Sequence, residues 1–286
     1  MNLSLADSFR HCEELARRSA GNFYPAFRVL PRDQRLAMCA LYAFMRITDD
    51  LADEPDTLEN RRRKLAQWRQ QLHRALAGDF EDPSHPALEH IVKKYGIPVR
   101  YLEDVLDGVE MDLEPIRFAT WDELQKYCYR VASAVGLCCI HIWGFRGEEA
   151  VPLAIQAGHA FQLTNILRDL GEDIGSGRVY LPTEDLDRFG YTEAMLKQSQ
   201  RNEAFRALMR FEVARARGLY ESSWPLVPLL ERPGRAVFLA MARTYRGLLD
   251  VIEARDYDVF SQRASVPKWR KAWNVVRSLP VRWGWG

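Results

Sequence analysis

The sequence lacks the features that mark several large classes of protein. It has no apolar run approaching the roughly 18 residues of a membrane-spanning helix, and its polar, charged N-terminal stretch predicts no secretory signal. Its 286 residues include only five cysteines, an odd number without a Cys-x-x-Cys pair, so we expect buried free thiols. The net charge of +1 gives no nucleic-acid footprint. These absences favour a protein of the reducing cytoplasm that binds no nucleic acid.

Strand patterns are nearly absent, and helical periodicity dominates the chain. Pro31 can open one long helix, Thr57 can cap the next, and Thr120 begins a capping box ahead of a helix that runs toward Trp143. Another long helix is predicted over residues 148–174. No internal repeat, low-complexity linker or composition break divides the chain. We therefore expect one all-α domain over the whole chain.

Two acidic pairs carry most of the functional information. Asp49 and Asp53 form one Asp-x-x-x-Asp pair, and Asp169 and Asp173 form the other. At this spacing two carboxylates lie one helical turn apart on the same face, which costs an isolated helix a few tenths of a kcal/mol. A hard divalent cation is the usual agent that offsets such repulsion. Mg²⁺ is commonly held by one or two carboxylates plus substrate phosphates.

The residues next to these pairs indicate whether the pairs form a ligand-binding site or an ordinary solvated helix face. A single acidic pair on a helix is most often a solvated face. Here Arg46 lies in an apolar stretch before the first pair, and Gln162 and Asn165 lead to the second pair in steps of three or four residues. Because polar groups buried without partners are costly, a polar stripe inside an apolar segment indicates a polar ligand. The pattern favours a metal–phosphate site in a helical core.

The last stretch of the chain, residues 265–286, combines basic residues and tryptophans without an acid. The basic residues are Lys268, Arg270, Lys271, Arg277 and Arg282, and the tryptophans are Trp269, Trp273, Trp283 and Trp285. Indoles and cations together suit a membrane interface, which predicts a peripheral contact with the cytoplasmic membrane face. The alternative is a final helix whose tryptophans cap the core.

Several motifs together resemble the squalene/phytoene synthase family. They occur in the order and spacing of that family and span roughly residues 8 to 265. They are Asn22-Phe23-Tyr24-x-x-Phe27-x-x-Leu30-Pro31, Leu41-Tyr42-Ala-Phe-x-Arg46-x-x-Asp49-Asp50-x-x-Asp53, Tyr127-Cys-Tyr129-Arg-Val-Ala132-Ser-Ala-Val135-Gly136, Gln162-x-x-Asn165-Ile-Leu-Arg168-Asp169-x-x-Glu172-Asp173 and Gly177-Arg178-x-Tyr180-Leu-Pro182.

The resemblance implies an all-α bundle of the isoprenoid synthase type with a central cavity. It implies head-to-head coupling of two prenyl diphosphates through a cyclopropylcarbinyl diphosphate, with Mg²⁺, or Mn²⁺ as an alternative, promoting diphosphate departure. The metal ligands it implies are Asp49, Asp53, Asp169 and Asp173. The catalytic group it implies is Tyr42, Arg46, Tyr129, Arg168 and Tyr180. The substrate-binding group is Asn22, Phe23, Asp50, Gln162, Asn165, Glu172, Arg178, Tyr245 and Arg263.

Substrate length and product stay open on the sequence alone. The motif from Tyr127 to Gly136 narrowly favours two fifteen-carbon substrates that give presqualene diphosphate or squalene, and two twenty-carbon substrates that give phytoene are the alternative. The chain has no Gly-x-Gly-x-x-Gly loop, but squalene synthases of this family lack one too, so NADPH use stays open. The oligomeric state is not predicted.

Two other classes of function are weighed against this one. A non-catalytic relative acting as an assembly factor at a membrane would be expected to lose metal ligands, and all four aspartates are intact here. A terpene cyclase would carry a different second motif, built from Asn, Ser or Thr, and Glu. Both are less favoured than the prenyltransferase.

Overall fold

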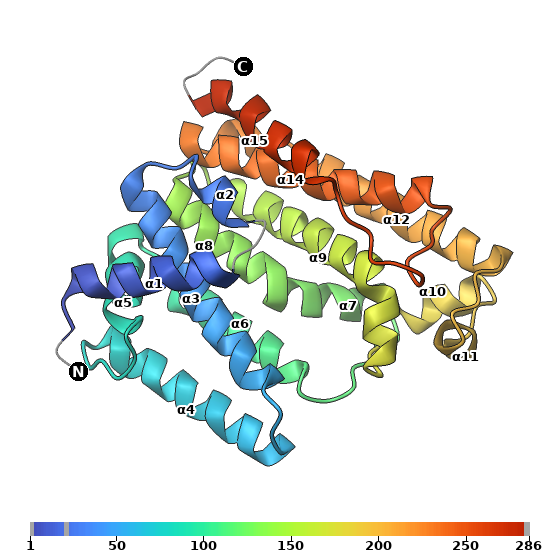
Figure 1. Cartoon of the computed structure of the whole chain (residues 1–286), viewed down its shortest axis with the longest axis horizontal. Helices are drawn as coiled ribbons and strands as arrows, with labels where there is room; N and C mark the ends of the chain where they lie inside the picture. The colour runs from blue at the N-terminus through green and yellow to red at the C-terminus, as the bar shows by residue number, and fades with distance from the viewer. Residues whose placement is uncertain (1–2, 20–22, 283–286) are drawn as a thin grey trace.

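The computed structural model describes residues 3–19 and 23–282, which form a bundle of α-helices (Figure 1). Within these ranges the only strand-like feature is an isolated backbone bridge between Phe145 and Leu230. The predicted all-α fold is confirmed. In chain order the helices are α1 (Leu5–Ser19), α2 (Phe23–Phe27), α3 (Arg32–Asp53), α4 (Leu58–Leu76), α5 (His85–Tyr95), α6 (Val99–Met111), α7 (Trp121–Cys128), η1 (Tyr129–Ser133), α8 (Ala134–Trp143), α9 (Ala150–Gly175), α10 (Thr183–Arg188), α11 (Glu193–Lys197), α12 (Glu203–Ser223), α13 (Leu226–Leu229), α14 (Arg232–Ala254) and α15 (Lys268–Arg282).

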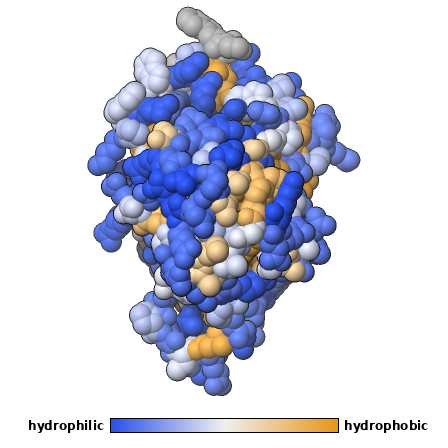
Figure 2. Space-filling model, turned by 90° about the vertical axis from the view of Figure 1, so that its right-hand side faces the viewer, coloured by the Kyte–Doolittle hydropathy of each residue, from blue (hydrophilic) through white to orange (hydrophobic). Residues whose placement is uncertain are grey.

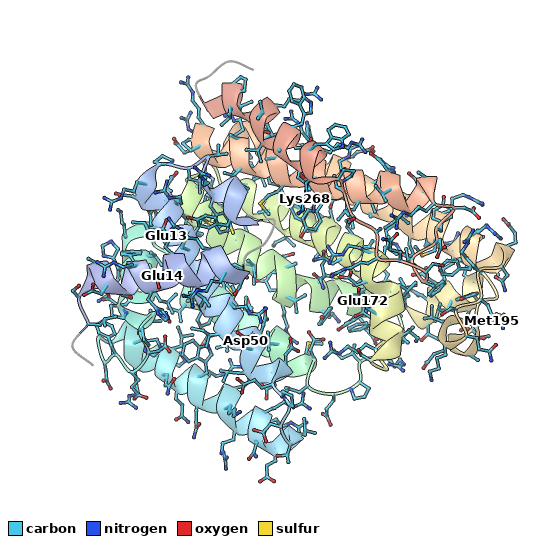
Figure 3. All side chains as sticks on the ribbon, in the orientation of Figure 1. Glu13, Glu14, Asp50, Glu172, Met195 and Lys268 are labelled. Carbon is cyan, nitrogen blue, oxygen red and sulfur yellow. The ribbon has the colours of Figure 1, made fainter. Side chains whose placement is uncertain are left out.

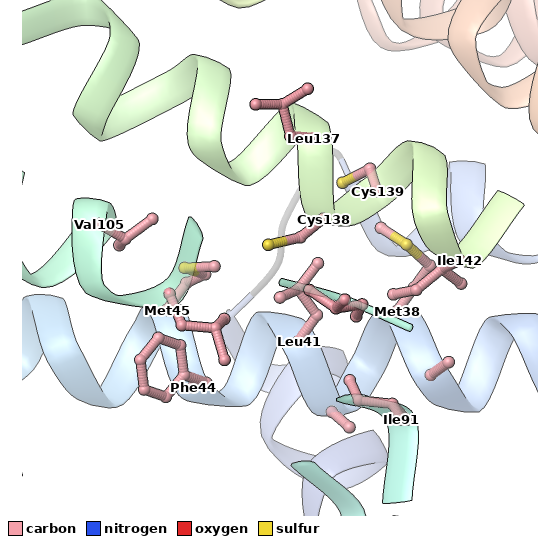
Figure 4. Packing of buried hydrophobic residues seen from close by; sticks show 14 of the residues in the cluster. Met38, Leu41, Phe44, Met45, Ile91, Val105, Leu137, Cys138, Cys139 and Ile142 are labelled. Atoms are coloured by element: carbon pink, nitrogen blue, oxygen red, sulfur yellow. The ribbon is translucent and has the colours of Figure 1, made fainter. Parts of the chain in front are cut away.

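Two long helices, α3 and α9, carry the acidic pairs. Helix α3 buries an apolar stripe whose members include Leu41 and Phe44, and Figure 4 shows this stripe packed against Cys138 and Ile142 of α8. Helix α9 packs against α8 on one side and α12 on the other. Each acidic pair lies in the last turns of its helix, because α3 ends at Asp53 and α9 at Gly175. The fold thus brings two carboxylate-bearing helix ends into one bundle.

The predicted helix starts are confirmed at two positions. The Thr57 hydroxyl accepts a hydrogen bond from the Asn60 backbone N–H, and the Thr120 hydroxyl accepts one from Glu123. The helix predicted to run toward Trp143 does so, but in three parts, since the π-helical turn η1 separates α7 from α8. A π turn inserts an extra residue into the helix and so rotates the downstream residues about the helix axis.

The C-terminal helix α15 packs along α14 (Figure 1). Asn274 donates a hydrogen bond to the Thr244 hydroxyl (3.1 Å), and Arg243 donates one to Ser278 (3.0 Å). Trp269 is 69% exposed and Trp273 57%, so these tryptophans do not cap the core. None of the described helices is both long and apolar enough to cross a membrane. The end of the molecule seen in Figure 2 is mostly hydrophilic, with small apolar areas.

Candidate active site

The first acidic pair lies at the C-terminal end of α3. The Asp49 side chain is exposed to solvent, but the surrounding protein still removes part of its hydration. This desolvation, and then the charge of Asp53, raises the pKa of Asp49 to about 7. The negative end of the helix dipole adds to this repulsion. Arg46, one turn earlier, donates to the Asp50 carboxylate (3.1 Å from Nε) and leaves Asp49 without this partner. The end of α3 therefore has an excess of negative charge that a cation would relieve.

The second pair, at the end of α9, is partly neutralised by arginines. Arg168 forms a two-point hydrogen-bonded ion pair with Asp169, and Arg263 donates to the same carboxylate (2.7 Å from Nε). Burial works to raise the pKa of Asp169, but these hydrogen bonds outweigh it and the pKa is lowered. Asp173 has no such bond from an arginine among the described residues, so burial and then the Asp169 charge raise its pKa to about 7. Figure 3 labels Asp50 on α3 and Glu172 on α9, one residue from each acidic cluster.

A fifth carboxylate, Asp112, connects the two acidic pairs. It caps the C-terminal end of α6, and its charge contributes to the raised pKa of both Asp49 and Asp173. It therefore lies near both helix ends. The Tyr127 hydroxyl donates to the Asp112 carboxylate (2.8 Å), as does that of Tyr180 (2.9 Å). Burial raises the pKa of Asp112, and the two hydroxyls limit that rise.

Asp112 and Tyr127 are not among the site residues predicted from the sequence. Tyr127 stands two residues before Tyr129 in the same motif, and the two cannot be told apart by residue type. The structure separates them, because the Tyr129 hydroxyl donates to Asp104 of α6 (3.1 Å), while Tyr127 faces Asp112 and stacks on Tyr180 with ring centroids 5.3 Å apart. The catalytic role that the resemblance implies for Tyr129 stays a prediction. No pattern in the sequence singled out Asp112, since it has no acidic partner one turn away.

Further cations surround the acidic groups. The Arg178 guanidinium lies close enough to interact with the charges of Asp53 and Asp173, one carboxylate from each pair. Tyr245 of α14 contacts Arg168. Lys271 of α15 has a lowered pKa, because burial and then the positive charge of Arg168 disfavour its protonated form. Its ammonium group therefore lies near Arg168. The basic C-terminal stretch thus brings a cation toward the second acidic pair, a role that the sequence pattern did not suggest.

An apolar cavity of about 190 Å³ lies between η1, α8, α9 and α14, and its lining reaches Asn165, one turn before Asp169. Gln162 and Asn165 line it and hydrogen-bond to each other (3.3 Å), while the Asn165 side-chain oxygen is buried without a partner in the described chain. Small residues, among them Ala132 and Gly136, form part of the cavity wall. Phe161 also lines it and meets the Tyr245 ring edge-on, with centroids 4.9 Å apart.

Three further residues of the predicted site precede Arg46 in the chain. Tyr42 is half-buried on α3 one turn before Arg46, and burial raises its pKa. Asn22 lies outside the described residues. Phe23 begins α2, and its side chain lies outside the described part of the structure.

The acidic groups suit a hard divalent cation. All the candidate donors are carboxylate oxygens, and two of them, Asp49 and Asp173, have pKa values of about 7 because burial, and then the charges of neighbouring carboxylates, disfavour the ionised form. In the described ranges no three Asp, Glu, His or Cys side chains are already gathered around one point. Mg²⁺ tolerates this arrangement, because it keeps waters and takes phosphate oxygens in addition to one or two carboxylates. The residues therefore fit a metal held between protein and diphosphate.

Solved structures share this architecture. A dehydrosqualene synthase crystallised with a ligand matches with a TM-score of 0.88 at 33% identity, over 96% of each chain. The squalene synthase of Alicyclobacillus acidocaldarius matches with a TM-score of 0.84 at 27% identity, over 88% of this chain and 95% of that one. The helical bundle with its acidic helix ends above an apolar cavity is thus an isoprenoid synthase fold.

Sequence comparison narrows the class to one family. The family described as squalene/phytoene synthase matches residues 16–270. The 15-cis-phytoene synthase of Synechococcus elongatus is 36% identical over 290 residues, covering 97% of this chain and 93% of the relative. The phytoene synthase of Arthrospira platensis is 37% identical over 283 residues, covering 93% and 90%. The chain belongs to the squalene/phytoene synthase family and is a prenyltransferase.

Proposed function

We propose that this prenyltransferase couples two twenty-carbon prenyl diphosphates head to head, through a cyclopropylcarbinyl diphosphate, to form phytoene. The observation that carries the proposal is the convergence of two acidic helix ends on Asp112 above an apolar cavity. The chain length is supported by relatives named phytoene synthase at 36% and 37% identity over nearly the whole chain. They favour twenty carbons over the fifteen that the motif alone favoured, so squalene formation becomes the alternative.

The polar residues bind and orient the diphosphates. Asp49 and Asp53 on α3, and Asp169 and Asp173 on α9, would hold Mg²⁺, which when bound supplies Lewis-acid stabilisation of the leaving diphosphate. Guanidinium groups match phosphate oxygens in a two-point geometry, and the arginines proposed for this role are Arg46, Arg168, Arg178 and Arg263. Asp50 and Glu172 pair with arginines and so orient them. Tyr180 holds the Asp112 carboxylate, and Tyr245 holds Arg168.

The apolar residues protect the allylic cation. In the cavity wall, Phe161 and Tyr245 present aromatic rings, which stabilise a nearby cation by roughly 0.5–2 kcal/mol each. Water is excluded because the rest of the wall is almost entirely aliphatic or aromatic. The released diphosphate is itself a base and can accept the proton whose loss ends the reaction. A reaction that ends in proton loss needs no hydride donor, so we expect no requirement for NADPH.

Product analysis tests the proposal directly. Purified protein is incubated with Mg²⁺ and either the fifteen- or the twenty-carbon diphosphate, with and without NADPH, and the hydrocarbon is identified by mass. We expect a forty-carbon product from the longer substrate that does not depend on NADPH. A thirty-carbon product formed preferentially from the shorter substrate would instead establish the alternative. Absence of any coupled product with either substrate would overturn the proposed function.

We also propose that α15 makes a peripheral contact with an anionic membrane surface. Among the described residues five large apolar side chains are exposed, and three of them, Trp269, Trp273 and Val276, lie on this helix. Their spacing of four and three residues places them on one face. A fourth, Trp224, lines a neighbouring hollow with Arg246 and Arg270. No acidic residue occurs over residues 259–286.

Co-sedimentation with vesicles tests this contact. Wild-type protein is expected to bind vesicles of phosphatidylglycerol more than vesicles of phosphatidylcholine, and the double variant Trp269→Ala/Trp273→Ala to lose most of that binding. Leu5→Ala, which removes an exposed apolar side chain from α1, is the matched control. Deletion of residues 265–286 is a poorer test, because it also removes Lys271 and the packing of α15 on α14. Equal binding by the double variant would contradict the proposal.

A further inference from the structure

The apolar cavity has a polar end and a closed end. On α9 its lining residues begin with Asn165, close to the second acidic pair, and run back to Ala154. On the opposing wall they run from Val131 of η1 to Trp143, the last residue of α8. A helix rises about 1.5 Å per residue, so this wall is about 18 Å long. Because a short loop reverses the chain between α8 and α9, Trp143 lies at the end far from the acidic groups.

Trp143 is fixed in place from several sides. Its side chain is only 4% exposed. A Cβ atom added to Gly234 of α14 would lie 2.3 Å from the Trp143 Cβ, so only glycine permits this close approach. The Gln34 side-chain amide donates to the Trp143 carbonyl (3.3 Å). In the described chain the indole N–H has no hydrogen-bond acceptor, so the ring is not oriented by a polar contact of its own.

The chain beyond Trp143 is held in place by backbone hydrogen bonds. The Arg146 N–H donates to the Leu229 carbonyl, and the Glu231 N–H donates to the Gly144 carbonyl, both at 2.9 Å. These bonds join the α8–α9 loop to the segment that leads from α13 into α14. Paired backbone groups do not yield to a longer ligand without losing hydrogen bonds. Of the side chains that line the cavity, the largest is that of Trp143, at this end.

From this geometry we infer that the Trp143 indole is the floor on which the end of the prenyl chain rests, and that it limits the chain length accepted. The inference rests on the proposed function and adds the residue that determines its substrate length. Each added five-carbon unit gains binding only if it is buried in apolar surroundings. A chain that reaches the floor has its next unit rejected by overlap with the ring, since packed interiors do not take up extra methylenes freely. Removing the ring opens space without touching the diphosphate end.

Competition between substrates tests the inference. The twenty- and twenty-five-carbon diphosphates are supplied together with Mg²⁺, and the ratio of their kcat/KM values is taken from the products. We expect Trp143→Ala to raise the ratio of the longer to the shorter substrate at least tenfold over wild type. Trp143→Phe removes less volume and is expected to raise it by a smaller factor. Trp143→Leu leaves a pocket of intermediate volume. If the alanine variant does not fold, the leucine and phenylalanine variants still test the inference.

The matched control is Trp68→Phe. Trp68 is also buried, but it lies on α4, where its indole N–H donates to Thr48 (2.9 Å), and it does not line the cavity. Its loss is expected to leave the ratio unchanged, which separates chain-length selection from loss of stability. If wild-type protein couples twenty-carbon substrates and the Trp143 variants keep its ratio, the floor assignment is overturned while the proposed function stands. If wild-type protein couples no prenyl diphosphate, both fail.

Discussion

Asp112 and Tyr127 contribute to the site through their position, although neither belongs to an acidic motif. The charge of Asp112 contributes to the raised pKa of one aspartate in each acidic pair, and the Tyr127 hydroxyl donates a hydrogen bond to the Asp112 carboxylate. A hydrogen bond to a charged group contributes about 1.5–3 kcal/mol. Loss of the Tyr127 hydroxyl therefore frees Asp112 to move and raises the cost of its charge.

We expect Tyr127→Phe to lower the turnover number by roughly 10- to 100-fold. Tyr129→Phe is the matched control, since the two tyrosines are neighbours in sequence and Tyr129 binds Asp104 outside this group. It should retain turnover within about twofold of wild type. Steady-state product formation measures both. Equal losses in the two variants would show that Asp112 does not depend on Tyr127.

Asp49 is the carboxylate of α3 that a metal would relieve most, because none of the described arginine side chains hydrogen-bonds to it and its pKa is raised to about 7. Metal stabilisation of a leaving oxygen contributes several kcal/mol, so Asp49→Asn should reduce diphosphate release by roughly 100-fold or more. Asp50→Asn, which removes only the partner of Arg46, should cost less. Pyrophosphate release and the circular dichroism spectrum are measured together. Full turnover by folded Asp49→Asn protein would remove this residue from the metal site.

At the scale of the elements, the approach of η1 to α9 positions the second acidic pair above the cavity. Gly158 makes this approach close, because a Cβ there would lie 2.4 Å from the Ser133 Cα. The Ser133 hydroxyl also donates to the Ile155 carbonyl (2.8 Å). The π turn and the glycine together set how near the two cavity walls come.

Gly158→Ala should therefore separate the two walls. Overpacking of this kind typically costs about 1–3 kcal/mol of unfolding free energy, and we expect turnover to fall with it. Gly218→Ala on α12 is the matched control, because no atom of the described residues lies within 4 Å of the added Cβ and alanine favours a helix by roughly 0.5–1 kcal/mol. Chemical denaturation compares the two. A Gly158→Ala variant as stable as wild type would mean that the contact can relax.

At the scale of the whole molecule, the two acidic helix ends couple stability to pH and to Mg²⁺. Asp49 and Asp173 have folded-state pKa values of about 7, well above the ordinary value of an aspartate. Between the ordinary value and pH 7 the folded protein holds protons that the unfolded chain has released. Stability of the metal-free protein should therefore fall as pH rises through this window and level off above it.

Mg²⁺ should reverse that trend, because it binds the ionised carboxylates. We expect the rise in Tm caused by Mg²⁺ with inorganic pyrophosphate to be small near pH 5 and to grow through pH 7. Thermal unfolding at a series of pH values measures it, and Asp49→Asn/Asp173→Asn protein, which lacks both groups, should show a weaker pH dependence. A Tm shift that is the same at pH 5 and pH 8 would contradict the coupling.

The sequence by itself determined the helical class, the helix starts at Thr57 and Thr120, and the two acidic pairs, because each depends on residues within a few turns of one another. Periodicity, capping and one-turn spacing are local properties that the chain carries in its order of residues.

Only the tertiary structure decided the rest, because the remaining contacts join residues far apart in the chain. Asp112 meets Tyr180 across 68 positions, Arg263 meets Asp169 across 94, and Gln34 reaches Trp143 across 109. Which of Tyr127 and Tyr129 faces the acidic groups depends on how their helix packs in the bundle, which brings Tyr127 to Asp112 and Tyr129 to Asp104. The far end of the cavity is set by backbone pairing between two loops, and such pairing leaves no pattern of residue types.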